Sequence, residues 1–225
     1  MIFDLDGVIA DTHPIHRQAW RQLLLEQRHQ VTEEQLDFVL EGRTRREILH
    51  HFFGSLSVCE ISHFGKRKDE LFYESAAGLR LRAIPGVIDF LHQLESAGVP
   101  KAVATSASKR RAHHVLELLG VTNRFCAVLT GNDIAAAKPD PSIFYLAANR
   151  LNVKPQQSLV AEDSLAGICA AKSAGMRCLG IGTGALSSRL CQEGADHVTP
   201  DFNGVSVSQL QNLFLESPRF SGTDH

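Results

Sequence analysis

The chain opens with Met1-Ile2-Phe3-Asp4-Leu5-Asp6-Gly7, a short apolar run followed by two carboxylates and a turn residue. The apolar run predicts a buried β-strand, along which side chains alternate, so Asp4 and Asp6 point to the same side. Gly7 ends the extended backbone, since glycine enters a tight turn at little steric cost. Two carboxylates this close repel unless a proton or cation lies between them, and oxygen ligands favour Mg²⁺. An ordinary strand with an Asp-Gly turn is the alternative interpretation.

The composition is that of a globular protein able to bury a sizeable core. Of 225 residues, 44% are apolar and 21% are charged. A formal net charge of −2 and the lack of a basic stripe argue against a nucleic-acid partner. No apolar stretch is as long as a membrane span, so we expect no membrane partner and a cytoplasmic location. The predicted strand leaves no room for a secretory signal; either it is brief or the natural protein begins upstream of Met1.

The five cysteines are typical of a reducing compartment, because no two of them form a Cys-x-x-Cys pair. Cys126, Cys169 and Cys178 lie within apolar runs. We therefore expect these three to be reduced and buried. We expect no catalytic or zinc-binding role for any of the five, the other two being Cys59 and Cys191.

The spacing of apolar residues divides the chain into two kinds of segment. Residues 13–79 show only helical spacing, with a capping box at Thr32-Glu33-Glu34-Gln35. From residue 80 onward, short apolar strands alternate with helices, a pattern typical of a parallel sheet covered on both faces. We predict an α/β fold, a Rossmann-like doubly wound parallel sheet with an inserted α-helical cap domain. Residues 1–12 and 80–225 would form the core, and residues 13–79 would form the cap. The expected strands cover residues 1–5, 100–106, 125–129, 158–161, 176–181 and 197–198.

Polar residues follow several of the predicted strands, and in an open parallel sheet the carboxyl ends of the strands form the ligand-binding edge. Carboxylates there would bind a cation, while a lysine and the amides at a helix N-terminus would bind a phosphate. Taken singly, these residues are better explained as helix caps or solvated loop residues. Their joint placement on successive strand ends favours a real site. The residues are Asp4, Asp6, Ser106, Ala107, Lys138, Glu162 and Asp163.

Four segments together resemble the motifs of the haloacid dehalogenase superfamily of phosphotransferases. They are Phe3-Asp4-Leu5-Asp6-Gly7, Thr105-Ser106-Ala107-Ser108, Lys138-Pro139-Asp140-Pro141 and Ala161-Glu162-Asp163-Ser164. Within the superfamily the chain is most similar to the β-phosphoglucomutase-like branch, and the helical insertion resembles that branch's small α-helical cap. The resemblance covers about residues 1–200.

The resemblance implies that Asp4 is the nucleophile that takes the phosphoryl group. Asp6 would protonate the leaving oxygen and then deprotonate the acceptor. A carboxylate needs no activating base, whereas Asp6 must carry a proton while Asp4 does not, so we expect environments that split their pKa values.

The resemblance also implies the binding groups. Mg²⁺ would be held by Asp4, the backbone carbonyl of Asp6 and Asp163, with Glu162 close by. The phosphoryl oxygens would be held by Ser106, the amide of Ala107 and Lys138.

The cap carries residues that resemble the second phosphate site of the mutases. The matching residues are His16, Gly42 and Arg45, with Lys109 following in the core. Glu41 stands where mutases generally have a lysine, which weakens the mutase interpretation. Ordinary surface positions are the alternative for His16 and Arg45, and Lys66-Arg67-Lys68 forms a further basic stretch.

We therefore expect a Mg²⁺-dependent phosphatase that acts on a small phosphorylated metabolite, a sugar phosphate being the favoured class, through an aspartyl-phosphate intermediate. A β-phosphoglucomutase-type mutase is the alternative enzyme. A non-enzymatic phosphoryl-receiver or binding module is the alternative from another class, although such modules need neither Asp6 nor a helical insertion. We expect a monomer or a weak homo-oligomer, and the sequence does not name the substrate.

Overall fold

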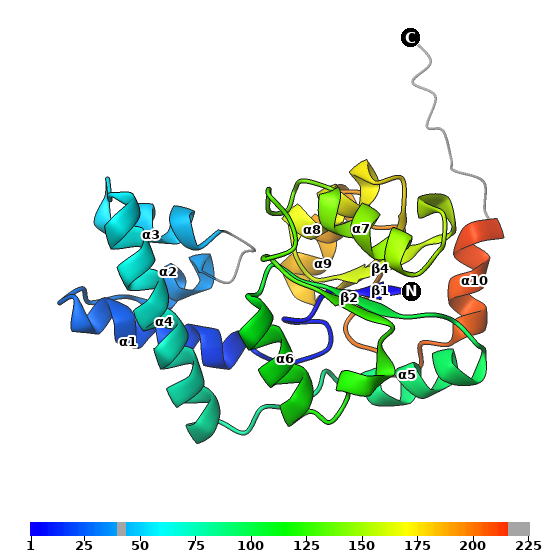
Figure 1. Ribbon diagram of the computed structural model, residues 1–225, viewed down its shortest axis with the longest axis horizontal. Helices are drawn as coiled ribbons and strands as arrows, with labels where there is room; N and C mark the ends of the chain where they lie inside the picture. The colour runs from blue at the N-terminus through cyan, green and yellow to red at the C-terminus, as the bar shows by residue number, and fades with distance from the viewer. Residues whose placement is uncertain (40–43, 216–225) are drawn as a thin grey trace, which may run out of the picture.

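The computed structural model describes residues 1–39 and 44–215. Its centre is a six-stranded parallel sheet with the order β3-β2-β1-β4-β5-β6 (Figure 1), which confirms the predicted doubly wound α/β fold. The first strand is shorter than predicted, because Leu5 already accepts hydrogen bonds from the turn that follows. The strands are β1 (Ile2–Phe3), β2 (Ala102–Ala104), β3 (Ala127–Leu129), β4 (Leu159–Glu162), β5 (Arg177–Ile181) and β6 (His197–Thr199).

The alternating side chains of β1 separate two buried apolar layers. Ile2 packs in one layer with Phe144, whereas Phe3 packs in the other with Phe90 and Phe202. Helices cover both layers, which explains why the central strands are apolar throughout. Among the described residues, no helix is both long and apolar enough to cross a membrane. The first layer is covered by α7 (Ser142–Arg150), α8 (Leu165–Ser173) and α9 (Gly184–Gln192), the second by α5 (Val87–Ser96), α6 (Lys109–Leu118) and α10 (Val207–Leu215).

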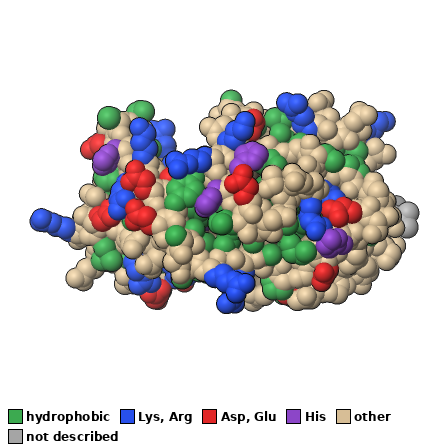
Figure 2. All heavy atoms as spheres, turned by 60° about the horizontal axis from the view of Figure 1, so that its bottom comes forward, with side chains coloured by type: hydrophobic (Ala, Val, Ile, Leu, Met, Phe, Trp, Pro, Cys, Tyr) green, Lys and Arg blue, Asp and Glu red, His purple; other side chains and the backbone are tan. Residues whose placement is uncertain are grey.

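Four helices follow β1 and lie to one side of the sheet (Figure 1); we call them the helical insertion. Thr32, Thr44 and Ser57 begin the second, third and fourth of these with capping boxes, of which the first was predicted. The surface is indented between the helical insertion, on the left in Figure 2, and the rest of the molecule. The helices are α1 (His13–Glu26), α2 (Glu33–Phe38), α3 (Arg45–Phe53) and α4 (Val58–Gly78).

The prediction of three buried cysteines is wrong for two of them. Cys178 is buried, but Cys126 is exposed and Cys169 is half-buried. Cys126 directly precedes β3, an edge strand whose first two residues are themselves only half-buried. An apolar run at a sheet edge therefore does not guarantee burial. The cysteines are free thiols.

Candidate active site

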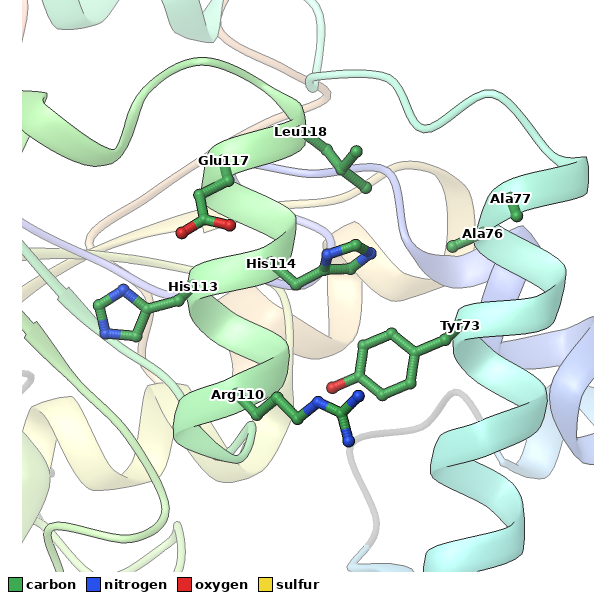
Figure 3. Close-up of a pocket in the computed structure, with 8 residues that line it drawn as sticks. All are labelled: Tyr73, Ala76, Ala77, Arg110, His113, His114, Glu117 and Leu118. Atoms are coloured by element: carbon green, nitrogen blue, oxygen red, sulfur yellow. The ribbon is translucent and has the colours of Figure 1, made fainter.

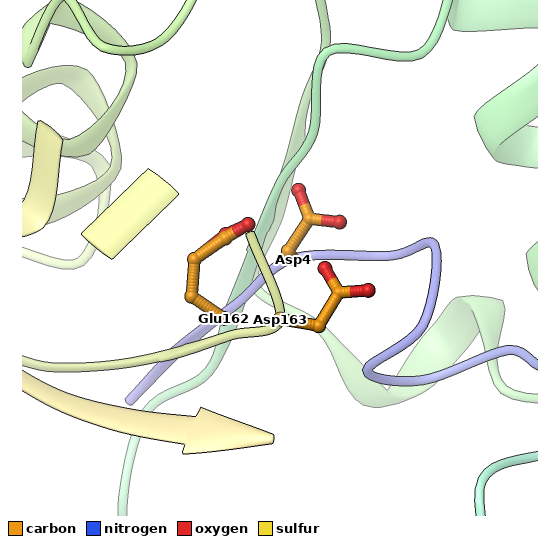
Figure 4. A group of neighbouring side chains, drawn as sticks. All are labelled: Asp4, Glu162 and Asp163. Atoms are coloured by element: carbon orange, nitrogen blue, oxygen red, sulfur yellow. The ribbon is translucent and has the colours of Figure 1, made fainter. Parts of the chain in front are cut away.

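The strand order reverses at β1, so that β1 and β4 end side by side. Asp4 directly follows β1, and its backbone N–H donates to the carbonyl oxygen of Ala161 at 2.9 Å. Glu162 ends β4, and Asp163 follows it. The carboxyl ends of strands at such a reversal form the binding crevice of doubly wound sheets. Asp4, Glu162 and Asp163 meet there (Figure 4), with one carboxylate oxygen of each within 4.8 Å of the others; we call them the acidic cluster.

Two glycines make room for the acidic cluster. Gly7 has a φ of +72°, and a Cβ there would lie 1.9 Å from Oδ2 of Asp163. A Cβ at Gly167 of α8 would lie 2.0 Å from the carboxyl carbon of Glu162. A larger residue at either position would collide with a carboxylate, so the two glycines allow the backbone to approach the acids closely.

Lys138 is the cation of the acidic cluster. Its buried ammonium donates to Oδ1 of Asp4 at 2.6 Å, to the carbonyl of Ala104 at 3.1 Å and to Oε2 of Glu162 at 3.5 Å. Burial alone would lower the pKa of Lys138, but Asp4 and Glu162 outweigh it and raise that pKa, so the ammonium stays charged. Burial raises the pKa of Asp4 to about 6 and that of Glu162 well above its usual range. Lys138 contacts Asp4 and Glu162, whereas Asp163 lies beside His13.

The donor set of the acidic cluster fits Mg²⁺. Its side chains offer only carboxylate oxygens, the ligands that a hard divalent cation prefers. A cation there would also lower the pKa of Asp4 and of Glu162, because it stabilises their charged forms. The structure thus brings together the predicted side-chain ligands, Asp4 and Asp163, and places Glu162 beside them as predicted.

Asp6 faces a second group of side chains, Arg111, His16 and Lys68, which we call the basic cluster. Nη2 of Arg111 lies 3.1 Å from Oδ2 of Asp6, and Nε2 of His16 lies 3.6 Å from Oδ1. The Thr12 hydroxyl donates to Oδ1 at 2.7 Å. Burial alone would raise the pKa of Asp6, but the charge of Arg111, with the hydrogen bond from the Thr12 hydroxyl, holds it well below its usual range.

His16 links the other two members of the basic cluster. Its Nε2 contacts the guanidinium of Arg111, and its Nδ1 lies 2.7 Å from Nζ of Lys68. Arginine can only donate, so Nε2 must accept, Nδ1 must carry the hydrogen, and Nζ must accept as an uncharged amine. Burial, Lys68 and Arg111 lower the pKa of His16 to about 3, and burial and Arg111 also lower the pKa of Lys68, in agreement with this arrangement. Arg111 therefore carries the charge of the basic cluster.

The expected difference between the two aspartate pKa values is present, but its sign is opposite to the prediction. We expected Asp4 to ionise first, whereas the pKa of Asp4 is raised and that of Asp6 is lowered. The reason is that Arg111 pairs with Asp6, while Asp4 shares Lys138 with the buried Glu162. A divalent cation beside Asp4, or the departure of Arg111 from Asp6, would shift the pair toward the predicted order.

The predicted phosphate-binding residues lie after β2, at the same edge of the sheet. Ser106 is exposed there, and the amide of Ala107 donates to the hydroxyl of Thr105 at 3.1 Å. Lys109 begins α6 and is exposed. The structure therefore places these residues on the rim and keeps the Ala107 amide occupied by a neighbouring side chain.

The predicted cap residues are only partly brought to the site. His16 contacts Asp6, as described above. Arg45 instead donates to Asp69 of α4 at 2.6 Å. Gly42 and Glu41 lie outside the described residues.

Several site residues were not predicted from the sequence. Nε2 of His13 lies 3.1 Å from Oδ2 of Asp163; burial alone would lower the pKa of His13, but Asp163 raises it to about 9. Lys68 was grouped with its surface neighbours, yet it is only 4% exposed. Arg111 had one recognisable signal, because Lys109-Arg110-Arg111 places three cations at the N-terminus of α6, where the helix dipole disfavours them.

Comparisons with known proteins show the family of the chain. A family model described as haloacid dehalogenase-like hydrolase matches residues 1–181. Validoxylamine A 7'-phosphate phosphatase of Streptomyces hygroscopicus subsp. limoneus is 36% identical over 81% of this chain and 84% of that protein. A phosphorylated carbohydrates phosphatase of Thermotoga maritima is 35% identical over 78% of this chain and 81% of that protein.

A solved structure agrees as well. The crystal structure of a β-phosphoglucomutase from Clostridium difficile, 28% identical, matches with a TM-score of 0.82 over 95% of this chain and 96% of that chain. The predicted superfamily and its β-phosphoglucomutase-like branch are confirmed, and the non-enzymatic receiver module is the wrong alternative. The chain belongs to the haloacid dehalogenase-like hydrolase family and is an enzyme of that family.

Proposed function

We propose that the protein is a Mg²⁺-dependent phosphatase that hydrolyses a small phosphorylated carbohydrate through an aspartyl-phosphate intermediate on Asp4. The observation that carries this proposal is the acidic cluster around Lys138, where the nucleophile, its orienting cation and carboxylate ligands share one strand edge. The two phosphatases named above support the substrate class, one being named for phosphorylated carbohydrates. The cytoplasm remains the predicted location, and a monomer or weak homo-oligomer the predicted assembly.

In the proposed first step, a carboxylate oxygen of Asp4 attacks phosphorus and the bond from phosphorus to the leaving oxygen breaks. Asp6 gives its proton to the leaving oxygen. Lys138 already holds one oxygen of Asp4 at 2.6 Å and so orients the nucleophile. When held by Asp4, Asp163 and the carbonyl of Asp6, with Glu162 close by, Mg²⁺ supplies charge that reduces repulsion between the carboxylate and the phosphate ester.

In the proposed second step, water attacks the phosphorus of the aspartyl phosphate and Asp6 takes a proton from it. The bond between phosphorus and Asp4 breaks, which releases phosphate and the free carboxylate. Asp6 is ready for this step in its ionised form, held by Thr12 and Arg111. Ser106, the Ala107 amide and Lys138 are proposed to bind the phosphoryl oxygens.

The helical insertion is proposed to act as the cap over the core formed by residues 1–12 and 80–225. His16, Gly42, Arg45 and Lys109 are proposed to contact the rest of the substrate. A β-phosphoglucomutase-type reaction is the second candidate, favoured by the structural match to such a mutase. The two reactions share the steps at Asp4 and differ in whether water or a sugar hydroxyl accepts the phosphoryl group.

A panel of sugar monophosphates tests the proposal, each incubated with Mg²⁺ and again with EDTA. We expect inorganic phosphate to be released with Mg²⁺ and not with EDTA. Conversion of β-glucose 1-phosphate to glucose 6-phosphate with little phosphate release would favour the mutase. A lack of turnover of every ester in Mg²⁺ would contradict both reactions.

A further inference from the structure

Arg111 lies where the leaving group of a substrate must arrive. Both carboxylate oxygens of Asp6 have partners, since the Thr12 hydroxyl donates to Oδ1 and Nη2 of Arg111 lies 3.1 Å from Oδ2. A leaving oxygen that receives its proton from Oδ2 must come within hydrogen-bond distance of that atom, and therefore within about 6 Å of the guanidinium. Asp6 cannot meet the leaving oxygen through Oδ2 without giving up or sharing Arg111.

The surroundings of Arg111 make an unpaired state costly. Its side chain is only 11% exposed, and its guanidinium lies 5.3 Å from the centre of the Phe72 ring. Its other hydrogen-bond partner, His16, is neutral. Within residues 1–39 and 44–215, Asp6 is the one carboxylate in ion-pair distance of Arg111. A buried arginine that loses its carboxylate is strongly disfavoured unless another anion replaces it.

The position of Arg111 on α6 also favours an anionic ligand. The first turn of α6 holds Lys109, Arg110 and Arg111 and contains no acidic residue. The partial positive charge of a helix N-terminus repels such cations and attracts anions. Three cations at this end oppose helix stability, and a bound anion would relieve that opposition.

We propose that Arg111 is a specificity-determining residue that selects phosphate esters whose leaving group carries a second anionic group one or two carbons from the leaving oxygen. When Asp6 turns to the leaving oxygen, that carboxylate or phosphate takes its place as the partner of Arg111. An uncharged leaving group offers no replacement, so its binding separates Arg111 from its only carboxylate among the described residues. The inference rests on the proposed function, because it takes Asp6 as the group that meets the leaving oxygen.

Three phosphate esters with the same two-carbon backbone test the inference. 2-Phosphoglycolate carries a carboxylate, ethylene glycol bisphosphate carries a second phosphate, and 2-hydroxyethyl phosphate carries a neutral hydroxyl group. We expect kcat/KM to favour one or both anionic esters over the neutral one, and Arg111→Gln to reduce that preference about 10- to 100-fold. The anionic ester whose kcat/KM falls more in Arg111→Gln shows whether a carboxylate or a phosphate is the preferred partner of Arg111. Arg111→Lys keeps a charge but not the planar fork, so it should retain part of the preference.

Arg110→Gln is the matched control, because it removes the same charge from the same helical turn. The guanidinium of Arg110 lies 4.8 Å from the centre of the Tyr73 ring, in a cavity of about 610 Å³ between α4 and α6 (Figure 3). We expect Arg110→Gln to change the preference by less than about twofold, since its charge is exposed and screened. If both variants lost the same share of the preference for anionic esters, the preference would come from the overall positive charge at the N-terminus of α6. That result would overturn the inference.

Binding measurements separate this inference from the proposed function. The three esters are titrated calorimetrically, with Mg²⁺, against Asp4→Asn and against Asp4→Asn combined with Arg111→Gln. A preference for the anionic esters that Arg111→Gln removes supports the inference even if the wild type hydrolyses none of the sugar monophosphates in the panel above, the result that defeats the proposed function. Hydrolysis of all three esters with a preference that Arg111→Gln leaves unchanged overturns the inference alone.

Discussion

The acidic and basic clusters lie side by side at Asp4 and Asp6 but have opposite charge balances. In the acidic cluster Lys138 contacts two of the three carboxylates and His13 lies beside the third, whereas in the basic cluster Arg111 and a His16–Lys68 pair surround a single carboxylate. Two aspartates only two residues apart therefore have pKa values shifted in opposite directions. The partners brought by the fold, and not the local sequence, therefore set the charge of each acid. One cluster is suited to a cation and the other to an anion.

Asp4→Asn should have the largest effect, a loss of turnover of at least about 10⁴-fold, because it removes the nucleophile while preserving the side-chain volume. Phosphate release from the best sugar phosphate measures the loss, and circular dichroism shows that the variant is folded. Turnover within tenfold of wild type would reject Asp4 as the nucleophile and with it the role of the acidic cluster.

Asp6→Asn should lower turnover of sugar phosphates by about 10²- to 10⁴-fold, since it removes only a proton transfer. The loss should be smaller for p-nitrophenyl phosphate, whose leaving group departs as a stable anion without a proton. Comparing kcat/KM for the two substrates measures this difference, because kcat/KM reports the first step and excludes the second step that both substrates share. An equal loss for both would mean that Asp6 does not act on the leaving oxygen.

Lys138→Met should lower the free energy of unfolding by about 3–5 kcal/mol, because it leaves Asp4 and Glu162 buried without their cation. Added Mg²⁺ should restore part of the loss by supplying positive charge to the acidic cluster. Urea denaturation with and without Mg²⁺ measures both effects. Lys172→Met is the control, since that lysine is one-third exposed and Asp196 keeps Arg177 as a second partner. Equal losses in the two variants would show that the acidic cluster does not depend on Lys138.

The increase in Tm caused by Mg²⁺ should grow as the pH rises through about 6, because burial raises the pKa of Asp4 to about 6 and its proton competes with the cation. In EDTA, stability changes with pH in the opposite direction and falls as the pH rises. The folded pKa exceeds the reference value of 3.8, so the stability due to protonated Asp4 is present at lower pH and lost as the pH rises through the folded value. Melting curves from about pH 5 to pH 7 measure both trends. An increase in Tm by Mg²⁺ that did not depend on pH, or that was unchanged in Asp4→Asn, would show that the proton on Asp4 does not compete with the cation.

Arg45→Gln should have the smallest effect, lowering the free energy of unfolding by less than about 1 kcal/mol, because its pair with Asp69 is partly exposed. Because Arg45 is proposed to contact the substrate through a partly exposed charge, we expect KM for a sugar monophosphate to rise by about threefold to fivefold, the size of an interaction of about 1 kcal/mol. Steady-state kinetics and urea denaturation measure the two values. An unchanged KM would reject the proposed contact between Arg45 and the substrate.

The acidic cluster could be predicted from the sequence because sheet topology brings strand ends together. Asp4 follows one central strand and Glu162 and Asp163 end its neighbour, so a parallel sheet alone makes them meet. Lys138 was recognisable from its motif. The parallel sheet and the helical character of the described part of residues 13–79 followed from hydrophobic spacing, whereas the order of the strands was not predicted.

The basic cluster could not be predicted in the same way, because it depends on how α1, α4 and α6 pack. Lys68 has basic neighbours on both sides, and nothing in their spacing shows that Lys68 is the one that reaches His16. Arg111 is separated from Asp6 by more than a hundred residues and joins it only through the placement of α6. The sign of the pKa difference between Asp4 and Asp6 depends on these contacts.

Acid-quenched turnover of a ³²P-labelled sugar phosphate tests the central claim most directly. The account predicts that label remains on the protein as a hydroxylamine-sensitive acyl phosphate, that peptide mapping places it on Asp4, and that EDTA and Asp4→Asn both abolish it. Label on another residue, or steady phosphate release with no labelled protein at any quench time, would contradict the account.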